Sequence, residues 1–223
     1  MAEASFIDNL PPDERAALMD LLKLHDHDAG EIVISQEEDS RDVYFVIDGA
    51  ARATIFSDEG KIVAYRDITA GAIFGELSAI DNAPRSASVV AVSKLRVGRL
   101  SQTAFTHLID TSPKFTWILM EYMTAQLRNM TARIFEFSTM LVRERLLAEL
   151  LRMGALAPSR EGWAEINPPP THFDFAARIS THREAVSREM SKLAKQGLIS
   201  KGDNGALKLN LEGLEALREV GLK

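Results

Sequence analysis

A glycine, a carboxylate and an arginine lie close enough in the sequence to build a pocket for a small anion. Gly75 is followed directly by Glu76 and Leu77, and Arg85 and Ser86 come about ten residues later. A glycine lets the backbone approach a ligand closely, and free amides at the start of a short helix favour a negative charge. A guanidinium pairs well with phosphate oxygens, so the return of Arg85 to this place would complete the pocket. The segment therefore predicts a binding site for a small phosphate.

A second group of polar residues, roughly a hundred positions further along, suits the groove of a DNA duplex. On a helix, Val186, Met190 and Leu193 would share a buried face, which leaves two nearby arginines exposed. Arginine recognises guanine O6 and N7 or binds phosphate, and a glutamate accepts a hydrogen bond from cytosine N4. The candidate DNA-binding residues are therefore Thr181, His182, Arg183, Glu184, Ser187 and Arg188.

Two capping patterns place these candidates in a helix-turn-helix. Thr171 with Asp174, and Thr181 with Glu184, both fit a capping box, in which the two side chains close the start of a helix. The second box would by itself explain Glu184 without any contact to a base. Two short helices that start about ten residues apart, with a turn at 179–181, are typical of DNA-binding proteins.

The composition excludes several classes of protein. The 223 residues contain no cysteine, which removes disulfides, thiolate nucleophiles, cysteine-bound zinc and iron–sulfur clusters. We therefore expect no metal, haem or iron–sulfur cofactor. No apolar run approaches the ~18 residues of a membrane span, and the first residues lack a basic stretch followed by an apolar one. We therefore expect a cytoplasmic protein that does not engage a membrane.

The charge is distributed unevenly along the chain. The formal net charge is −6, which by itself argues weakly against a nucleic-acid partner. Residues 1–137 hold 13 basic and 21 acidic side chains, whereas residues 176–208 hold seven basic and three acidic ones. The sequence therefore predicts a basic C-terminal patch on an acidic body.

The expected secondary structure changes twice along the chain. A helix over 11–24 is followed by β-rich runs separated by turn signals, which favour a small antiparallel barrel or roll. The expected strands are 31–35, 43–47, 51–56, 61–66, 86–92 and 95–100, with turns at Asp48-Gly49, Asp58-Glu59-Gly60 and Ala70-Gly71. After the helix-turn-helix, the Asp203-Asn204-Gly205 segment predicts a β-hairpin wing with a type I′ turn.

A long helix is expected between these two parts, over residues 112–141. Its apolar residues alternate at steps of three and four, which is the heptad seam of a coiled coil. They are Met120, Met123, Leu127, Met130, Ile134, Phe137 and Leu141. The seam favours self-association into a homodimer, and the alternative is a helix that buries the same stripe against its own barrel.

The chain resembles the CRP/FNR transcription regulators over nearly its whole length, and its cyclic nucleotide-binding domain from about Asp28 to Ile109. The matching segments are Phe74-Gly75-Glu76-Leu77-Ser78, Pro84-Arg85-Ser86-Ala87 and Arg183-Glu184-Ala185-Val186-Ser187-Arg188. The resemblance implies an α+β fold with an N-terminal antiparallel β-roll over 1–111, a dimerisation helix over 112–141 and a winged helix-turn-helix over 142–223. It also implies 3′,5′-cyclic AMP as an allosteric effector, RNA polymerase as a partner and a palindromic operator of the TGTGA type.

The same resemblance implies a role for each pocket residue. Gly75 would let the backbone close on the ligand, and Glu76 would accept the ribose 2′-OH. The backbone N–H of Leu77, the guanidinium of Arg85 and the hydroxyl of Ser86 would bind the cyclic phosphate. A further position, Thr131 on the long helix, would meet the adenine edge. Met130 stands before it where the cyclic-AMP receptor pattern has a hydroxyl residue, which leaves cyclic GMP as an alternative effector.

Two other interpretations remain open at this point. The chain could be a regulator that binds DNA constitutively or senses a different ligand in the same roll. It could also be an enzyme, since His25-Asp26-His27 resembles part of a cupin metal site. The histidines are expected to precede the first strand, and the following glutamate spacing of cupins is missing. We therefore expect them to be surface residues and expect no catalytic activity.

Overall fold

The computed structural model describes residues 5–36, 38–56, 62–202 and 205–221. The chain forms two compact units, one reaching to Asn129 and the other starting at Met130, each described by itself below. No helix in these ranges is both long and apolar enough to serve as a membrane span. The predicted turn at Asp58-Glu59-Gly60 and the wing residues Asp203 and Asn204 lie outside the described ranges.

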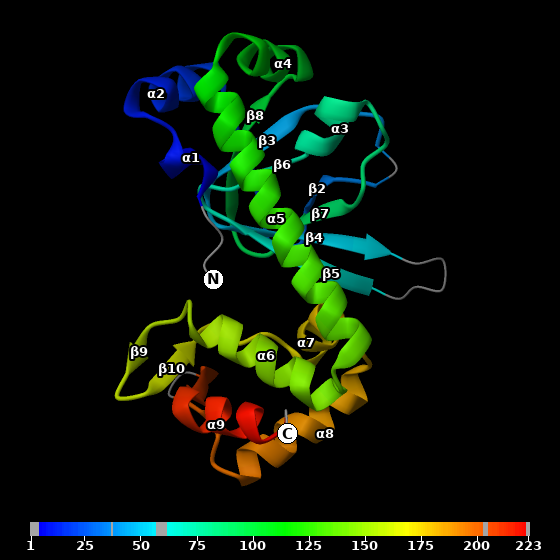
Figure 1. Cartoon of the computed structure of the whole chain (residues 1–223), viewed down its shortest axis with the longest axis vertical. Helices are drawn as coiled ribbons and strands as arrows, with labels where there is room; N and C mark the ends of the chain where they lie inside the picture. Colours follow the sequence, from blue (N-terminus) through cyan, green and yellow to red (C-terminus); the bar gives the residue numbers. More distant parts are fainter. Residues whose placement is uncertain (1–4, 37, 57–61, 203–204, 222–223) are drawn as a thin grey trace. The chain divides into compact units, whose positions relative to one another are not determined.

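The first unit is an antiparallel β-roll with helices around it (Figure 1). Its strands form two four-stranded sheets in the orders β1-β8-β3-β6 and β2-β7-β4-β5. The strands are β1 (Lys23–His27), β2 (Ile32–Ile34), β3 (Val43–Asp48), β4 (Ala50–Phe56), β5 (Ile62–Thr69), β6 (Ile73–Phe74), β7 (Ser88–Ala91) and β8 (Leu95–Leu100). The helices are α1 (Phe6–Asn9), α2 (Pro12–Leu21), α3 (Glu76–Asp81) and α4 (Gln102–Thr111), followed by α5 (Pro113–Thr139). The predicted roll is thus confirmed.

The start of the roll corrects one expectation. The helix predicted over 11–24 ends at Leu21, and residues Lys23–His27 form strand β1, paired antiparallel with β8. His25 and His27 therefore lie on the first strand, so the expectation that they precede it was wrong. Strand β1 stands at the edge of its sheet, and four of its five residues are exposed. An edge strand of this kind shows no alternation of apolar and polar residues, which is why the sequence did not reveal it.

The long helix α5 has two kinds of apolar surface. Its first turns pack into the core of the roll through Phe115, Ile118, Leu119 and Tyr122. Most of the predicted seam is instead exposed, with Leu127 and Ile134 each 66% accessible and Met120, Met130 and Leu141 also exposed. Apart from Met123, which packs against the core of the roll, the buried stripe of α5 and the heptad seam are therefore different residues. Packing against its own roll does not account for the seam.

The second unit is a winged helix-turn-helix (Figure 1). Its elements are α6 (Val142–Gly154), β9 (Ser159–Arg160), β10 (Trp163–Ile166), α7 (His172–Arg178), α8 (Arg183–Lys195), β11 (Ile199–Lys201), β12 (Leu207–Asn210) and α9 (Leu211–Gly221). Strands β11 and β12 pair antiparallel, as predicted for the wing, within a sheet of order β11-β12-β10-β9. Its core gathers Leu146, Leu150, Phe175, Val186, Leu193, Leu209 and Leu214.

Candidate functional site

The turn before helix α3 is built around Gly75. Gly75 is the N-cap of α3 and has a φ of +82°, a left-handed conformation that favours glycine. A Cβ atom at this position would lie 2.9 Å from the Nη1 of Arg85 and 2.9 Å from the carbonyl oxygen of Asp42. Both backbone conformation and space therefore require glycine here, at the place where the sequence predicted a close approach.

Arg85 is buried beside this turn and is held by three oxygen atoms. Its Nη1 donates to the carbonyl oxygen of Gly75 at 2.9 Å, and its Nη2 donates to Ser40 Oγ at 2.8 Å and to the carbonyl oxygen of Asp42 at 2.9 Å. The residue is only 4% accessible, and its Nε has no hydrogen-bond partner within the described part of the chain. Burial lowers the pKa of Arg85 from its usual value, because desolvation penalises the charged form.

Among the residues that the structure describes, no carboxylate forms a hydrogen bond with the guanidinium of Arg85. All three of its bonds go to uncharged oxygens, and the nearby Asp42 carboxylate pairs with Arg99 instead. A guanidinium has five N–H donors, so three bonds leave two donors available. A buried cation without a contacting anion is costly, and an anionic ligand would relieve that cost.

The other predicted pocket residues differ in their burial. Glu76 is buried, at 6% accessibility, and is the first residue of α3, where a carboxylate suits the helix dipole. Leu77 and Ser86 are exposed. Thr131 is exposed on α5, in the second compact unit.

Ser40 and Asp42 are functional candidates that the sequence did not reveal. They lie 45 and 43 positions from Arg85 and precede β3. One contributes a hydroxyl and the other a backbone carbonyl to the arginine. A backbone acceptor leaves no trace in residue type, so no sequence signal could have identified Asp42 in this role.

The first helix of the helix-turn-helix starts as predicted. Thr171 caps α7, with its Oγ1 accepting from the backbone N–H of Asp174 at 3.1 Å. The Asp174 carboxylate accepts from the backbone N–H of Thr171 at 2.9 Å, which completes a capping box.

The second capping box was wrong. Helix α8 begins at Arg183, its N-cap is His182, and no side chain caps it. Thr181 instead ends the preceding helix, because its backbone N–H donates to the carbonyl oxygen of Ala176 at 2.9 Å across the left-handed residue Ser180, with φ +50°. This is the geometry of a Schellman ending, in which glycine is the usual left-handed residue. Glu184 is exposed and does not close the helix, so capping no longer explains it.

The outer face of α8 is polar and basic. His182, Arg183, Glu184 and Arg188 are exposed, whereas Thr181 and Ser187 are half-buried. Val186, Met190 and Leu193 are buried on the opposite face, as the sequence predicted. The helix therefore offers two arginines at i and i+5 to a partner outside the protein, an arrangement that suits a DNA groove.

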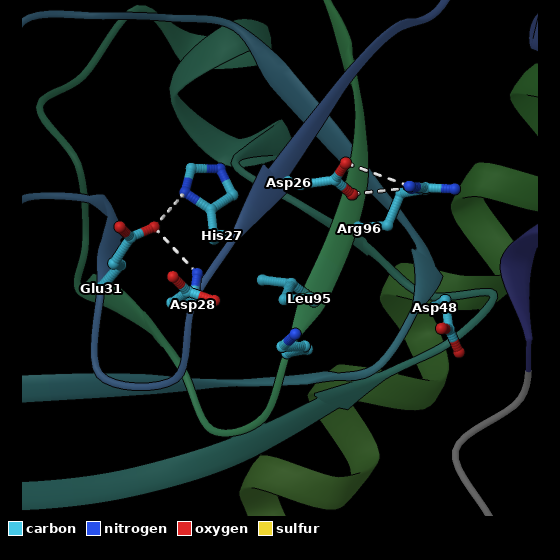
Figure 2. Close-up of a pocket in the computed structure, with 8 residues that line it drawn as sticks. Asp26, His27, Asp28, Glu31, Asp48, Leu95 and Arg96 are labelled. Atoms are coloured by element: carbon cyan, nitrogen blue, oxygen red, sulfur yellow. Dashed lines mark hydrogen bonds and ion pairs between the residues drawn. The ribbon is translucent and has the colours of Figure 1, made fainter.

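A hollow of about 450 Å³ lies elsewhere on the roll, away from the predicted pocket residues. It is lined by Asp26, His27, Asp28, Glu31, Asp48, Lys94, Leu95 and Arg96. Figure 2 shows pairs among some of its polar groups: Arg96 with Asp26, and Glu31 with both His27 and the Asp28 backbone. Within the described ranges, no group of three or more histidine, aspartate or glutamate residues is arranged so that it could hold a metal ion.

Comparison with known families finds a match for each of two parts of the chain. Residues 24–112 match the cyclic nucleotide-binding domain, and residues 144–217 match the Crp-like helix-turn-helix domain. A CRP-like cAMP-activated global transcriptional regulator of Mycobacterium tuberculosis is 23% identical over 200 residues, which is 89% of each chain.

Two further similarities concern one half of the chain and the whole fold. A cAMP-dependent protein kinase regulatory subunit of Mycosarcoma maydis is 33% identical over 114 residues, and the match spans 49% of this chain but only 22% of the regulatory subunit. The solved structure of the c-di-GMP-responsive global regulator CLP of Xanthomonas campestris has a TM-score of 0.80 at 15% identity, covering 89% of this chain and 99% of that one. At this identity the structural likeness concerns the fold.

Proposed function

The chain belongs to the CRP/FNR family of DNA-binding transcription regulators, and on this basis we propose that it is a homodimer controlled by a cyclic nucleotide, 3′,5′-cyclic AMP. One observation carries the proposal: within the described part of the chain, the buried guanidinium of Arg85 bonds only uncharged oxygens and keeps two donors available. A cyclic phosphate is an anion of suitable size and charge for it. The family consists of transcription regulators, and we propose no catalytic activity.

In this proposal, different pocket residues bind different parts of the ligand. Arg85 and Ser86 bind the cyclic phosphate, and the backbone N–H of Leu77 adds a donor. Glu76 accepts a hydrogen bond from the ribose 2′-OH, which selects ribose over deoxyribose. Thr131 contacts the adenine edge.

Helix α8 is the DNA-reading element of this proposal. Arg183 and Arg188 contact guanine edges or phosphates, Glu184 accepts from cytosine, and Thr181, His182 and Ser187 contact the backbone of the duplex. The two helices of a homodimer would reach half-sites one turn of DNA apart, in a palindrome of the TGTGA type. RNA polymerase is the proposed protein partner, in the cytoplasm.

The exposed seam of α5 is the proposed dimer contact. Leu127, Met130 and Ile134 are large apolar side chains left accessible at heptad spacing. Ligand binding would shift the populations of the possible arrangements of the two seams and so change the affinity for DNA, which is an allosteric coupling between two sites.

Calorimetry on the wild type and on Arg85→Leu tests the ligand half. We expect cyclic AMP to bind the wild type and not the variant, and Arg96→Leu, which removes an exposed arginine from the same roll, to bind normally. A mobility shift on a TGTGA palindrome, titrated with cyclic AMP and with cyclic GMP, tests the DNA half. Unchanged binding of cyclic AMP by a folded Arg85→Leu variant would reject the pocket.

A second candidate keeps the DNA binding but changes the effector. It is favoured by the similarity of the fold to a regulator described as responsive to c-di-GMP. In this case the same calorimetry would show that c-di-GMP binds to the wild type, or that neither cyclic AMP nor cyclic GMP binds to it. A footprint of equal strength with and without any nucleotide would instead indicate a constitutive regulator.

A further inference from the structure

The carbonyl groups that end helix α7 are held by arginines from two other helices. Arg133, on the last turns of α5, donates from Nη2 to the carbonyl oxygen of Arg178 at 3.0 Å. Arg145, on α6, donates from Nη1 to the carbonyl oxygen of Ile179 at 2.8 Å. The last carbonyls of a helix lack partners within it, and their partial negative charge attracts cations. The turn that precedes the recognition helix α8 is therefore fixed from outside the helix-turn-helix.

A buried carboxylate organises these arginines. Glu149 of α6 is 1% accessible and accepts from Arg133 Nη1 at 2.9 Å and from Arg178 Nη1 at 2.9 Å. Arg152 also pairs with Glu149 and donates to Glu136 of α5 at 2.7 Å. One carboxylate thus joins the end of α5, helix α6 and the last residue of α7. All of these residues belong to the second compact unit.

Arg133 has a special place in this cluster because it makes two bonds at once. One of its nitrogens bonds the buried Glu149 and the other bonds the main chain of α7. Its guanidinium also lies 5.5 Å from the ring centre of Phe137 on the same helix. A planar fork held at both ends fixes an angle as well as a distance, which a lysine could not do.

We propose that Arg133 and Glu149 are positioning residues for DNA recognition, which fix the turn before α8 onto the last turns of α5. The cluster sets the orientation in which α8 meets the duplex without touching DNA itself. Buried ion pairs are a weak source of stability compared with apolar residues of the same volume, but a misplaced partner in one is strongly unfavourable. Such a cluster is therefore suited to defining a geometry.

Two DNA affinities of the full-length protein distinguish this positioning role from a merely structural one. The first is the affinity for an operator that the wild type has selected from a random duplex pool, and the second is that for an unrelated duplex of equal length. In Arg133→Gln and in Glu149→Gln we expect the specific affinity to fall about tenfold, or about 1.4 kcal/mol. The non-specific affinity should stay constant, because Arg183 and Arg188 remain exposed.

Matched controls remove the same charges from exposed sites. Arg128→Gln changes an exposed arginine on α5, and Glu165→Gln changes an exposed glutamate on β10. We expect both controls to keep the wild-type ratio of specific to non-specific affinity. Melting curves establish that each variant is folded. If Glu149→Gln fails to fold, Arg133→Gln alone tests the proposal, because it retains the ion pairs of Arg152 and Arg178 with Glu149.

Two outcomes would overturn the proposal. Unchanged affinities of folded Arg133→Gln for both duplexes would reduce the cluster to a structural role. An equal fall in both affinities, with a weaker salt dependence, would mean that Arg133 contacts phosphate directly. The assay needs only DNA binding, so a wild type that ignores every nucleotide would contradict the proposed effector while leaving this comparison decisive.

Discussion

The Nη1 of Arg85 donates to the carbonyl oxygen of Gly75 at 2.9 Å, across ten positions of the chain. The same glycine begins α3 in a left-handed conformation, so the arginine is anchored to the turn that starts the helix. The turn and the guanidinium consequently cannot move independently. A ligand that displaces one of them would therefore disturb the other.

Gly75→Ala should destabilise the roll and weaken nucleotide binding. The left-handed conformation alone costs about 1–2 kcal/mol for a residue with a Cβ. The added atom would also lie 2.9 Å from Arg85 Nη1 and from the Asp42 carbonyl oxygen, and the backbone oxygen cannot easily move away. Urea denaturation and calorimetry with cyclic AMP would measure both effects.

Gly30→Ala is the matched control for that variant. Gly30 has a similar φ of +91°, but a Cβ there meets nothing within 4 Å. The Gly30→Ala variant should therefore lose stability only through the left-handed backbone conformation, since the new Cβ atom collides with nothing. Its nucleotide binding should be unchanged. Equal losses of stability in the two variants would contradict the close approach at Gly75.

Thr171→Ala should destabilise the helix-turn-helix, whereas Thr181→Ala should not. Thr171 closes α7 through a complete capping box, and removing such a cap costs about 1 kcal/mol. Thr181 uses only its backbone N–H, which alanine retains. Amide exchange in the first turn of α7, together with urea denaturation, would measure the difference. Comparable effects of the two substitutions would show that Thr181 caps α8 after all.

This pair of threonines marks the limit of the sequence prediction. Both sites have the same local pattern, and the prediction was confirmed at one and wrong at the other. The difference arises at Ser180, whose left-handed conformation lets Thr181 complete the end of α7 and shifts the start of α8 to the next residues. A capping pattern describes only the start of one helix. It therefore contains no information that the backbone N–H of Thr181 is bonded in the C-terminal ending of the preceding helix.

The roll could be predicted where its strands alternate and turn residues separate them. Most of β8 was identified in this way, because its arginines are exposed and its apolar residues buried. Most of β3 was identified as a β-rich run before a turn signal, although residues 43–46 are all buried. Strand β1 was missed because the exposed edge gave no such contrast. The partners of Arg85 were missed for another reason, since Ser40 and the Asp42 carbonyl reach it only through the folding of the roll.

Tyr44→Phe should make stability less dependent on pH in the alkaline range. Burial raises the pKa of the Tyr44 hydroxyl above its usual value, so the folded protein holds this proton more tightly than the unfolded chain. The resulting stabilisation is complete below the unfolded pKa of about 10 and is lost as the pH rises through the folded value. Urea denaturation between pH 8 and about 11 would measure it. The variant should lose stability less steeply than the wild type over this range, and parallel curves would contradict the assignment.

Ile134→Asp should dissociate the homodimer, whereas Phe135→Asp should not. Ile134 is 66% accessible and belongs to the heptad seam, while Phe135 is 61% accessible but lies outside that seam, about 100° further round the helix. Burying an isoleucine contributes about 1.5–3 kcal/mol, so two copies at a two-fold interface contribute about 3–6 kcal/mol. Their loss corresponds to a rise of at least about a hundredfold in the dimer dissociation constant. Sedimentation equilibrium would measure it against the 24.7 kDa chain mass. If Phe135→Asp were to dissociate the protein and Ile134→Asp were not, the chains would pair through a different face of α5.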